Sequence, residues 1–305
     1  KKAVGVEIVQ EGRKQVLHAE TEVILSAGAI QSPQILQLSG IGPGKLLKEH
    51  GIDVVVNRPG VGQNLQDHYQ MRTVVQMRSR DSLNNQIRNP ISLLKMGLDW
   101  AFRGRGALTV GAGQVGGAMR TDFAPTDQPD LQLFVMPLSV DKPGEPLHRY
   151  PGFTSAIWQC HPKSRGSIEI VTPDPTADPK IQPNYLADEL DQKTMVEGIR
   201  ILRQIYNQPK FRDLWDAEIV PGEQVKTDAD IIDAIRKGGG TVYHPVGTCK
   251  MGIDAAAVVG PDLRVHGVTG LRVVDASIMP LITSANTNAP TLMIAEKAAE
   301  MILAS

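Results

Sequence analysis

The chain has 305 residues, and its 32 Lys and Arg against 33 Asp and Glu give a formal net charge of −1. A near-neutral chain with 4% aromatic residues lacks the basic surface and stacking side chains of a nucleic-acid-binding protein. Two cysteines, Cys160 and Cys249, support neither a disulfide framework nor a zinc site, and no apolar run is long enough to span a bilayer. We expect a globular protein of one or two domains without a metal, in the cytoplasm, with membrane association left open.

The chain opens with a β pattern. Residues 4–9 and 14–19 alternate apolar and polar side chains around a Glu-Gly turn, which predicts a hairpin, and residues 22–26 predict a short buried strand. A chain that starts in the middle of a sheet leads us to expect that an upstream part of the protein is missing.

A glycine turn at Gly28 then leads into a predicted helix. Ser32 is a natural N-cap, Pro33 suits the first helical position, and Gly40 ends the helix. Such a strand–turn–helix unit can hold a ligand against backbone N–H groups at the positive end of the helix. A glycine-rich loop follows at residues 59–68, and its closing Asp-His pair is interpreted as a capped turn.

From about residue 70 the pattern changes. Short strands are predicted at residues 72–77, 131–137, 154–161 and 166–172. An amphipathic helix is expected at residues 89–103, a long helix at residues 188–207, and a capped helix from Thr227. Strands and helices that do not alternate strictly predict an α+β unit around an antiparallel sheet.

The stretch from Thr241 to Cys249 carries the main chemical signal. Three glycines precede it, and Pro245 restricts the backbone of His244 to extended geometry. An imidazole can take or give a proton near neutral pH, so a stiffly held His beside glycines suits a general base. The alternative is a structural His at the end of a strand.

Two later residues are also candidates. Asp275 ends a predicted strand, where cofactor-binding residues lie in open α/β sheets, although it could simply cap the next turn. Asn288 precedes Ala289 and Pro290 at the start of a final helix, and it is expected to be the N-cap of that helix. The positive end of this helix would stabilise negative charge on a bound group.

These segments together resemble one enzyme family. The run at residues 28–42, the stretch Tyr-His-Pro-Val-Gly-Thr at residues 243–248 and the late motifs at residues 271–280 and 286–291 are similar to the glucose–methanol–choline (GMC) oxidoreductases. The similarity covers nearly the whole chain, is weakest over residues 81–151, and is greatest to the choline dehydrogenase-like and alcohol dehydrogenase branch. It implies oxidation of a primary alcohol to the aldehyde with flavin adenine dinucleotide (FAD).

The resemblance also implies domains and residue roles. Residues 1–69 and 238–305 would form part of an FAD-binding domain, and residues 70–237 would form a substrate domain. His244 would take the hydroxyl proton, and Asn288 would hold the substrate oxygen. The residues expected beside the flavin are Tyr243, Asp275, Ala276, Asn288, Ala289, Pro290 and Thr291.

The chain departs from the family pattern in two respects. The Gly-x-Gly-x-x-Gly fingerprint for the dinucleotide is absent, since the glycine-rich run at residues 111–117 lacks a preceding strand. We therefore expect FAD to be poorly bound or absent unless the N-terminal half of the same enzyme, or a second chain, supplies that part. Gln114 stands where choline-specific members are expected to place a carboxylate, which favours a neutral alcohol.

Other interpretations stay open at this point. His161 is similar to a substrate-side His of some family members, but it could equally be a strand-end His bonded to the backbone. A hydroxynitrile lyase-like relative would use the same His with the flavin in a structural role only. An inactive, cofactor-free fragment is the third possibility.

Overall fold

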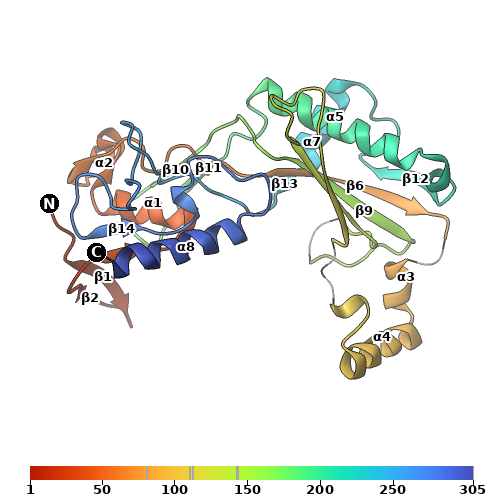
Figure 1. Cartoon of the computed structure of the whole chain (residues 1–305), viewed down its shortest axis with the longest axis horizontal. Coiled ribbons are helices and arrows are strands. Elements are labelled where there is room, and N and C mark those ends of the chain that lie inside the picture. The colour runs from red at the N-terminus through yellow and green to blue at the C-terminus, as the bar shows by residue number, and fades with distance from the viewer. Residues whose placement is uncertain (80–81, 110, 112, 142–143, 305) are drawn as a thin grey trace. The chain divides into compact units, whose positions relative to one another are not determined.

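The computed structural model describes residues 1–79, 82–109, 111, 113–141 and 144–304, and the chain divides into two compact units (Figure 1). Unit 1 comprises residues 1–68, 161–187 and 243–305, and unit 2 comprises residues 69–160 and 188–242. Residues 161–187, predicted to lie in the substrate domain, instead pack within unit 1. The buried side chain of Gln37 explains this placement, because it bonds the backbone of Ile168 and Ile170.

The centre of unit 1 is a parallel pair of strands from opposite ends of the sequence. β3 (Val23–Leu25) pairs with β14 (Leu271–Val273), and each strand leads towards a helix, α1 (Gly28–Leu38) and α8 (Asn288–Leu303). The apolar side chains of these elements form one core cluster, in which Val273 is fully buried. The β–α arrangement predicted from the turn at Gly28 is therefore confirmed.

The predicted N-terminal hairpin is also confirmed, with β1 (Gly5–Gln10) antiparallel to β2 (Arg13–His18). The remaining elements of unit 1 are short, because glycines and prolines interrupt the chain at close intervals. They are α2 (Gly44–Glu49), the parallel strands β4 (Ile41–Gly42) and β5 (Val56–Asn57), the antiparallel strands β10 (Ser167–Glu169) and β11 (Lys180–Gln182), and the 3₁₀ turn η2 (Ala276–Ile278).

Helix α1 begins earlier than predicted. The sequence signals placed its start at Ser32 and Pro33, but the helix starts at Gly28 and encloses Pro33. Proline has no N–H, so the carbonyl of Ala29, four residues before it, loses its helical donor. The buried hydroxyl of Thr248 donates to that carbonyl over 2.6 Å. A contact between distant segments thus makes the proline acceptable inside the helix.

Unit 2 is built on an antiparallel sheet with the strand order β12–β6–β9–β8–β7, and β13 pairs with the start of β6. The central strand β9 is buried along its whole length, which explains why its sequence is almost continuously apolar or small. The strands are β6 (Tyr69–Met77), β7 (Val115–Met119), β8 (Leu131–Met136), β9 (Gly152–Gln159), β12 (Trp215–Val220) and β13 (Gly240–Thr241).

Helices accompany this sheet, and the long helix α5 (Glu189–Tyr206) packs on β9. The predicted cap of α7 (Asp228–Gly238) is confirmed, because Thr227 and Asp230 bond each other's backbone as a capping box. The other helices are α3 (Leu83–Arg88), α4 (Pro90–Arg103), the 3₁₀ turn η1 (Ala107–Thr109) and α6 (Pro209–Arg212). Within the described ranges, no helix combines the length and apolar character needed to cross a bilayer.

Candidate active site

His244 lies in unit 1, and contacts of its backbone fix its position. The residue before it, Tyr243, has φ 62° and is 78% exposed, so a bulky aromatic residue occupies left-handed backbone that side chains seldom adopt. Such strain is found preferentially at functional sites. The backbone N–H of His244 donates to Oδ1 of Asp67 over 2.9 Å, and the residue is only 8% exposed.

Both ring nitrogens of His244 contact polar side chains. Nδ1 lies 2.9 Å from Nδ1 of His68, which is fully buried, and Nε2 lies 3.0 Å from the amide nitrogen of Asn286. An amide nitrogen can only donate, so Nε2 of His244 carries the lone pair and Nδ1 carries the proton. Nδ1–H of His244 then donates to Nδ1 of His68. This pattern leaves the basic nitrogen on the side of Asn286.

The surroundings keep His244 neutral at pH 7. Burial lowers the pKa of His244 below the ordinary imidazole value, and the smaller, opposing influence is the charge of Asp67, which raises it. The Asp67 carboxylate also accepts a hydrogen bond from the hydroxyl of Tyr185 over 2.5 Å. A neutral imidazole with a directed lone pair can accept a proton, which is what a general base must do.

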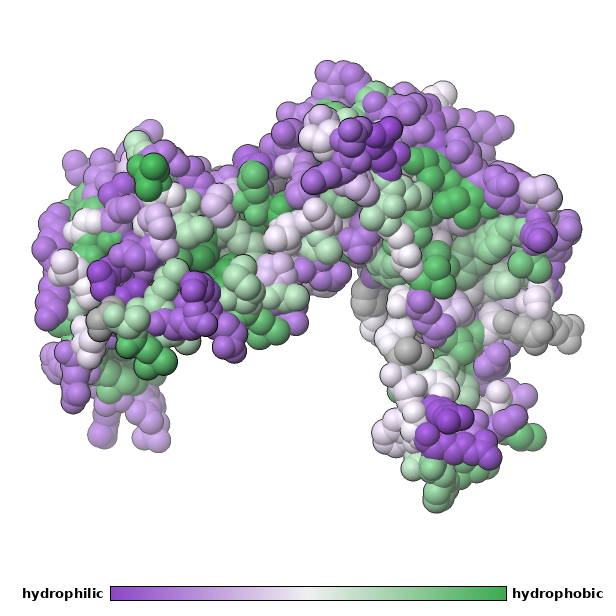
Figure 2. All heavy atoms as spheres, viewed as in Figure 1, coloured by the Kyte–Doolittle hydropathy of each residue, from purple (hydrophilic) through white to green (hydrophobic). Residues whose placement is uncertain are grey.

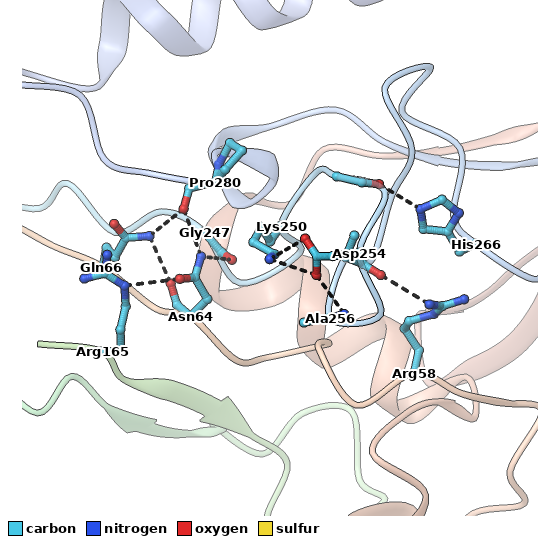
Figure 3. Close-up of polar contacts among 12 residues, drawn as sticks. Arg58, Asn64, Gln66, Arg165, Gly247, Lys250, Asp254, Ala256, His266 and Pro280 are labelled. Atoms are coloured by element: carbon cyan, nitrogen blue, oxygen red, sulfur yellow. Dashed lines mark hydrogen bonds and ion pairs between the residues drawn. The ribbon is translucent and has the colours of Figure 1, made fainter. Parts of the chain in front are cut away.

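Contacts between three loops fix this geometry. Gln66 and Val246 form an antiparallel bridge, and the side-chain amide of Gln66 donates to the carbonyl of Pro280 (Figure 3). Asn64 donates in the same way to the carbonyl of Gly247. Gly247 has φ 93°, and a Cβ there would lie 2.6 Å from the carbonyl oxygen of Asn64, so this position requires glycine. The His68, His244 and Asn286 segments are therefore held together.

His161 is bonded to the loop that carries Asn286. Its Nδ1 lies 3.1 Å from the carbonyl oxygen of Ile282, and its Nε2 lies 2.9 Å from the hydroxyl of Ser284. The carbonyl can only accept, so Nδ1 carries the proton. This geometry matches the interpretation of His161 as a backbone-bonded residue, and a substrate contact for it remains a prediction.

Asp275 makes several bonds to its own chain. Its Oδ2 accepts hydrogen bonds from the N–H of Gly28 and from the hydroxyl of Ser32, and its Oδ1 accepts from the N–H of Ser277. The carboxylate thus caps η2 and anchors the start of α1, as the capping interpretation predicted. Ala276 follows it and accepts a hydrogen bond from the N–H of Gly247.

The start of α8 differs from the prediction by one residue. Asn288 is the first helical residue, and Thr287 occupies the N-cap position without making a side-chain cap. Asn288 and Ala289 are exposed, while Pro290 and Thr291 are half-buried. The expected N-cap role of Asn288 is therefore wrong, because its backbone is already helical. An uncapped first turn leaves backbone donors available for a bound anionic group.

The remaining predicted residue, Gln114, belongs to unit 2. It precedes the edge strand β7, its side chain is exposed, and its N–H donates to the carbonyl of Val135. In the glycine-rich run around it, Ala112 lies outside the described residues, and Val115–Met119 form β7.

The sequence did not predict the contacts of Asp67, His68 and Asn286 with His244. The sequence predicts a capped turn for the first two and favours Asn288, two residues after Asn286, as the substrate-holding amide. Nothing local marks them, because their bonds to His244 join segments far apart in the sequence. Asn286 and Asn288 belong to the same motif at residues 286–291, and the sequence does not show which of the two amides contacts His244.

Comparison with known proteins shows the family of the chain. Profiles of the N-terminal and C-terminal parts of the GMC oxidoreductases match residues 1–70 and 162–295. An alcohol dehydrogenase [acceptor] of Pseudomonas putida is 43% identical over 309 residues, which cover 99% of this chain and 55% of that protein. The oxygen-dependent choline dehydrogenase 1 of Chromohalobacter salexigens is 40% identical, over 99% of this chain and 54% of that protein.

The fold shows the same relationship. A formate oxidase structure from Aspergillus oryzae superposes with a TM-score of 0.92 at 28% identity, over 99% of this chain and 57% of that one. The chain thus spans about half the length of the relatives that it matches. The two family profiles, the similarity over nearly the whole sequence and the fold all indicate the same family. The chain therefore belongs to the GMC oxidoreductase family.

Proposed function

We propose that this chain carries the C-terminal catalytic part of an FAD-dependent enzyme that oxidises a primary alcohol to the aldehyde. The observation that carries the proposal is the contact between Nε2 of His244 and the amide of Asn286. It marks a basic nitrogen and a hydrogen-bond donor at one point, which is what a substrate hydroxyl requires. The names of two relatives, an alcohol dehydrogenase and a choline dehydrogenase, support this reaction class.

In the proposed mechanism, the substrate hydroxyl replaces the direct 3.0 Å contact between Nε2 of His244 and Nδ2 of Asn286 and is bonded by both groups. Nε2 accepts the hydroxyl proton, and the amide of Asn286 donates to the oxygen as negative charge develops on it. His68 accepts from Nδ1–H throughout and so keeps the imidazole in the required tautomer. Asp67 holds the backbone of His244 in place through its N–H.

The residues around this site fit a flavin. The first turn of α8 has no side-chain cap, so its N–H groups can stabilise an anionic ring, and the exposed ring of Tyr243 can lie along a flat cofactor. Bound FAD would supply the hydride acceptor. We assign Asn288, Ala289, Pro290 and Thr291 to the ring side and Ala276 to the phosphate side. Asp275 would act there by holding Gly28 and Ser32 rather than by binding phosphate itself.

The rest of the enzyme would dock on an apolar pocket in unit 1. The pocket has a volume of about 720 Å³ and lies between the hairpin, β3 and α1, with Val4, Val6, Leu25, Ile35 and Leu36 among its lining residues. Parallel sheets are normally covered on both faces, whereas Ile24 of β3 is 43% exposed. We propose that the part found in the longer relatives, on the same chain or a second one, covers this surface and completes the FAD site.

This proposal has a direct spectroscopic consequence. The 305-residue chain purified alone is expected to bind little FAD, because the dinucleotide fingerprint is not part of it. Flavin absorbance per mole of protein measures this, and the complete enzyme is the control. A stoichiometric, stable yellow chain of 305 residues would contradict the proposed need for a partner.

The substrate is proposed to be a neutral primary alcohol, because Gln114 brings neither a carboxylate nor an aromatic ring for a quaternary ammonium group. The test is anaerobic mixing of the complete enzyme with aliphatic alcohols and with choline. Bleaching of the flavin absorbance by an alcohol, with release of the aldehyde, is the expected result. A flavin that stays oxidised while a cyanohydrin is cleaved would instead identify a lyase. A higher kcat/KM for choline than for aliphatic alcohols would overturn the substrate assignment.

A further inference from the structure

Helix α4 of unit 2 exposes the apolar side chains of its amphipathic pattern. No residue of α4 is buried, and Ile91, Leu94 and Phe102 are 79%, 64% and 83% exposed. Figure 2 shows hydrophobic residues on the surface of the α3–α4 segment, beside a cluster of hydrophilic ones. Apolar side chains exposed together on one helix point to an interaction site.

The helix is well formed although it buries so little. Asn89 caps its first turn by accepting from the N–H groups of Ile91 and Ser92, Pro90 occupies the first turn, and Gly104 ends it in left-handed geometry. Its main contacts within unit 2 are with the neighbouring elements α3 and η1. Local capping, rather than a hydrophobic core, therefore holds this helix in shape.

The apolar side chains occupy both sides of α4. At 3.6 residues per turn, Ile91, Leu94, Leu98 and Phe102 lie within an arc of about 80°. Leu93 and Trp100, which are 44% and 56% exposed, lie on the opposite side. The charged side chains Lys95, Asp99 and Arg103 occupy a second arc of about 80° between them. A protein groove contacts only one face of a helix. The apolar layer of a lipid surface can contact both apolar sides, while the narrow charged stripe stays in water.

The net charge of this segment indicates which kind of apolar surface the helix binds. Residues 82–109 contain four basic residues and one acidic residue, so they have a net charge of +3 in a chain whose net charge is −1. The acidic residue, Asp99, already forms an ion pair with Arg103. A net-positive segment whose helix carries Trp, Phe and Leu side chains resembles in composition the helices that lie in the plane of a membrane surface. An anionic headgroup layer complements it in charge and in hydrophobicity.

We propose that α4 anchors the enzyme to an anionic phospholipid surface, with Ile91, Leu94, Leu98, Trp100 and Phe102 inserted and the basic residues at the headgroups. This in-plane binding is independent of the proposed alcohol oxidation. Each inserted apolar group adds affinity through burial, and each basic residue adds attraction to the anionic surface.

The test is flotation of the complete enzyme with vesicles of phosphatidylcholine, with and without phosphatidylserine. We expect binding to the phosphatidylserine vesicles, and we expect Ile91→Ser with Phe102→Ser to lower the bound fraction at least about tenfold. Lys95→Gln with Arg105→Gln should reduce binding only where phosphatidylserine is present, as added salt also should. Ile253→Ser is the matched control, because Ile253 is a 90% exposed isoleucine of unit 1.

Retained alcohol oxidation will show that the variants are folded. The proposal is overturned if the enzyme floats with neither vesicle, or if Ile253→Ser lowers binding as much as the double substitution does. It is also overturned if the double substitution splits an oligomer on size exclusion without changing flotation, because α4 would then be a contact between copies of the chain.

Discussion

Replacing His244 by Ala in the complete enzyme will slow anaerobic flavin reduction by an alcohol about 10²–10⁴-fold, the usual contribution of a positioned base. The imidazole presents an unprotonated Nε2 beside the amide of Asn286, and that amide can donate a hydrogen bond but cannot accept a proton. Stopped-flow absorbance of the flavin measures the reduction rate directly. An unchanged rate would remove His244 from the mechanism.

The control for this substitution is His18→Ala, since His18 is an exposed histidine of β2. A pH profile of the unsubstituted enzyme provides a second check. The base acts when neutral, and burial lowers its pKa, so the reduction rate should hold from alkaline pH to below pH 6.5 and fall only at more acidic pH. A rate that already falls above pH 7 would contradict a buried, neutral His244.

Replacing Asn286 by Ala is expected to slow the same step about 10–100-fold, the worth of one hydrogen bond to a charged group. The matched variant is Asn288→Ala, which we expect to change the rate less than about threefold, because the backbone N–H stays in place. The two residues lie two positions apart, but only the amide of Asn286 is bonded to Nε2 of His244. Reduction rates of both variants at saturating alcohol decide between them.

A second substitution at residue 286 shows whether the rate loss in Asn286→Ala comes from the missing hydrogen-bond donor or from a changed loop structure. Asn286→His keeps a donor on the side chain, so it should recover most of the rate lost in Asn286→Ala. A larger loss in Asn288→Ala than in Asn286→Ala would return the oxygen-holding role to Asn288. Unfolding temperatures of the variants should agree with that of the unsubstituted enzyme, because Asn286 is exposed.

Elements whose signals lie within a few residues were predicted from the sequence. The hairpin β1–β2, the capping box of α7 and the long helix α5 all follow from turn residues, caps and apolar spacing, and all three are confirmed. His244 was singled out as a candidate base for a similarly local reason, namely the proline after it and the glycines before it. Local signals suffice for such features because the backbone conformation of each depends on its own neighbours.

Only the tertiary structure showed where distant segments meet. α1 encloses Pro33, and Thr248 supplies the hydrogen bond that Pro33 cannot make. The partners of His244 proved to be His68 and Asn286, which nothing in their own neighbourhoods distinguishes. The apolar spacing of α4 predicts an amphipathic helix, but spacing records only the hydrophobicity of a face. What covers that face depends on the surroundings of the helix, and for α4 they leave it exposed.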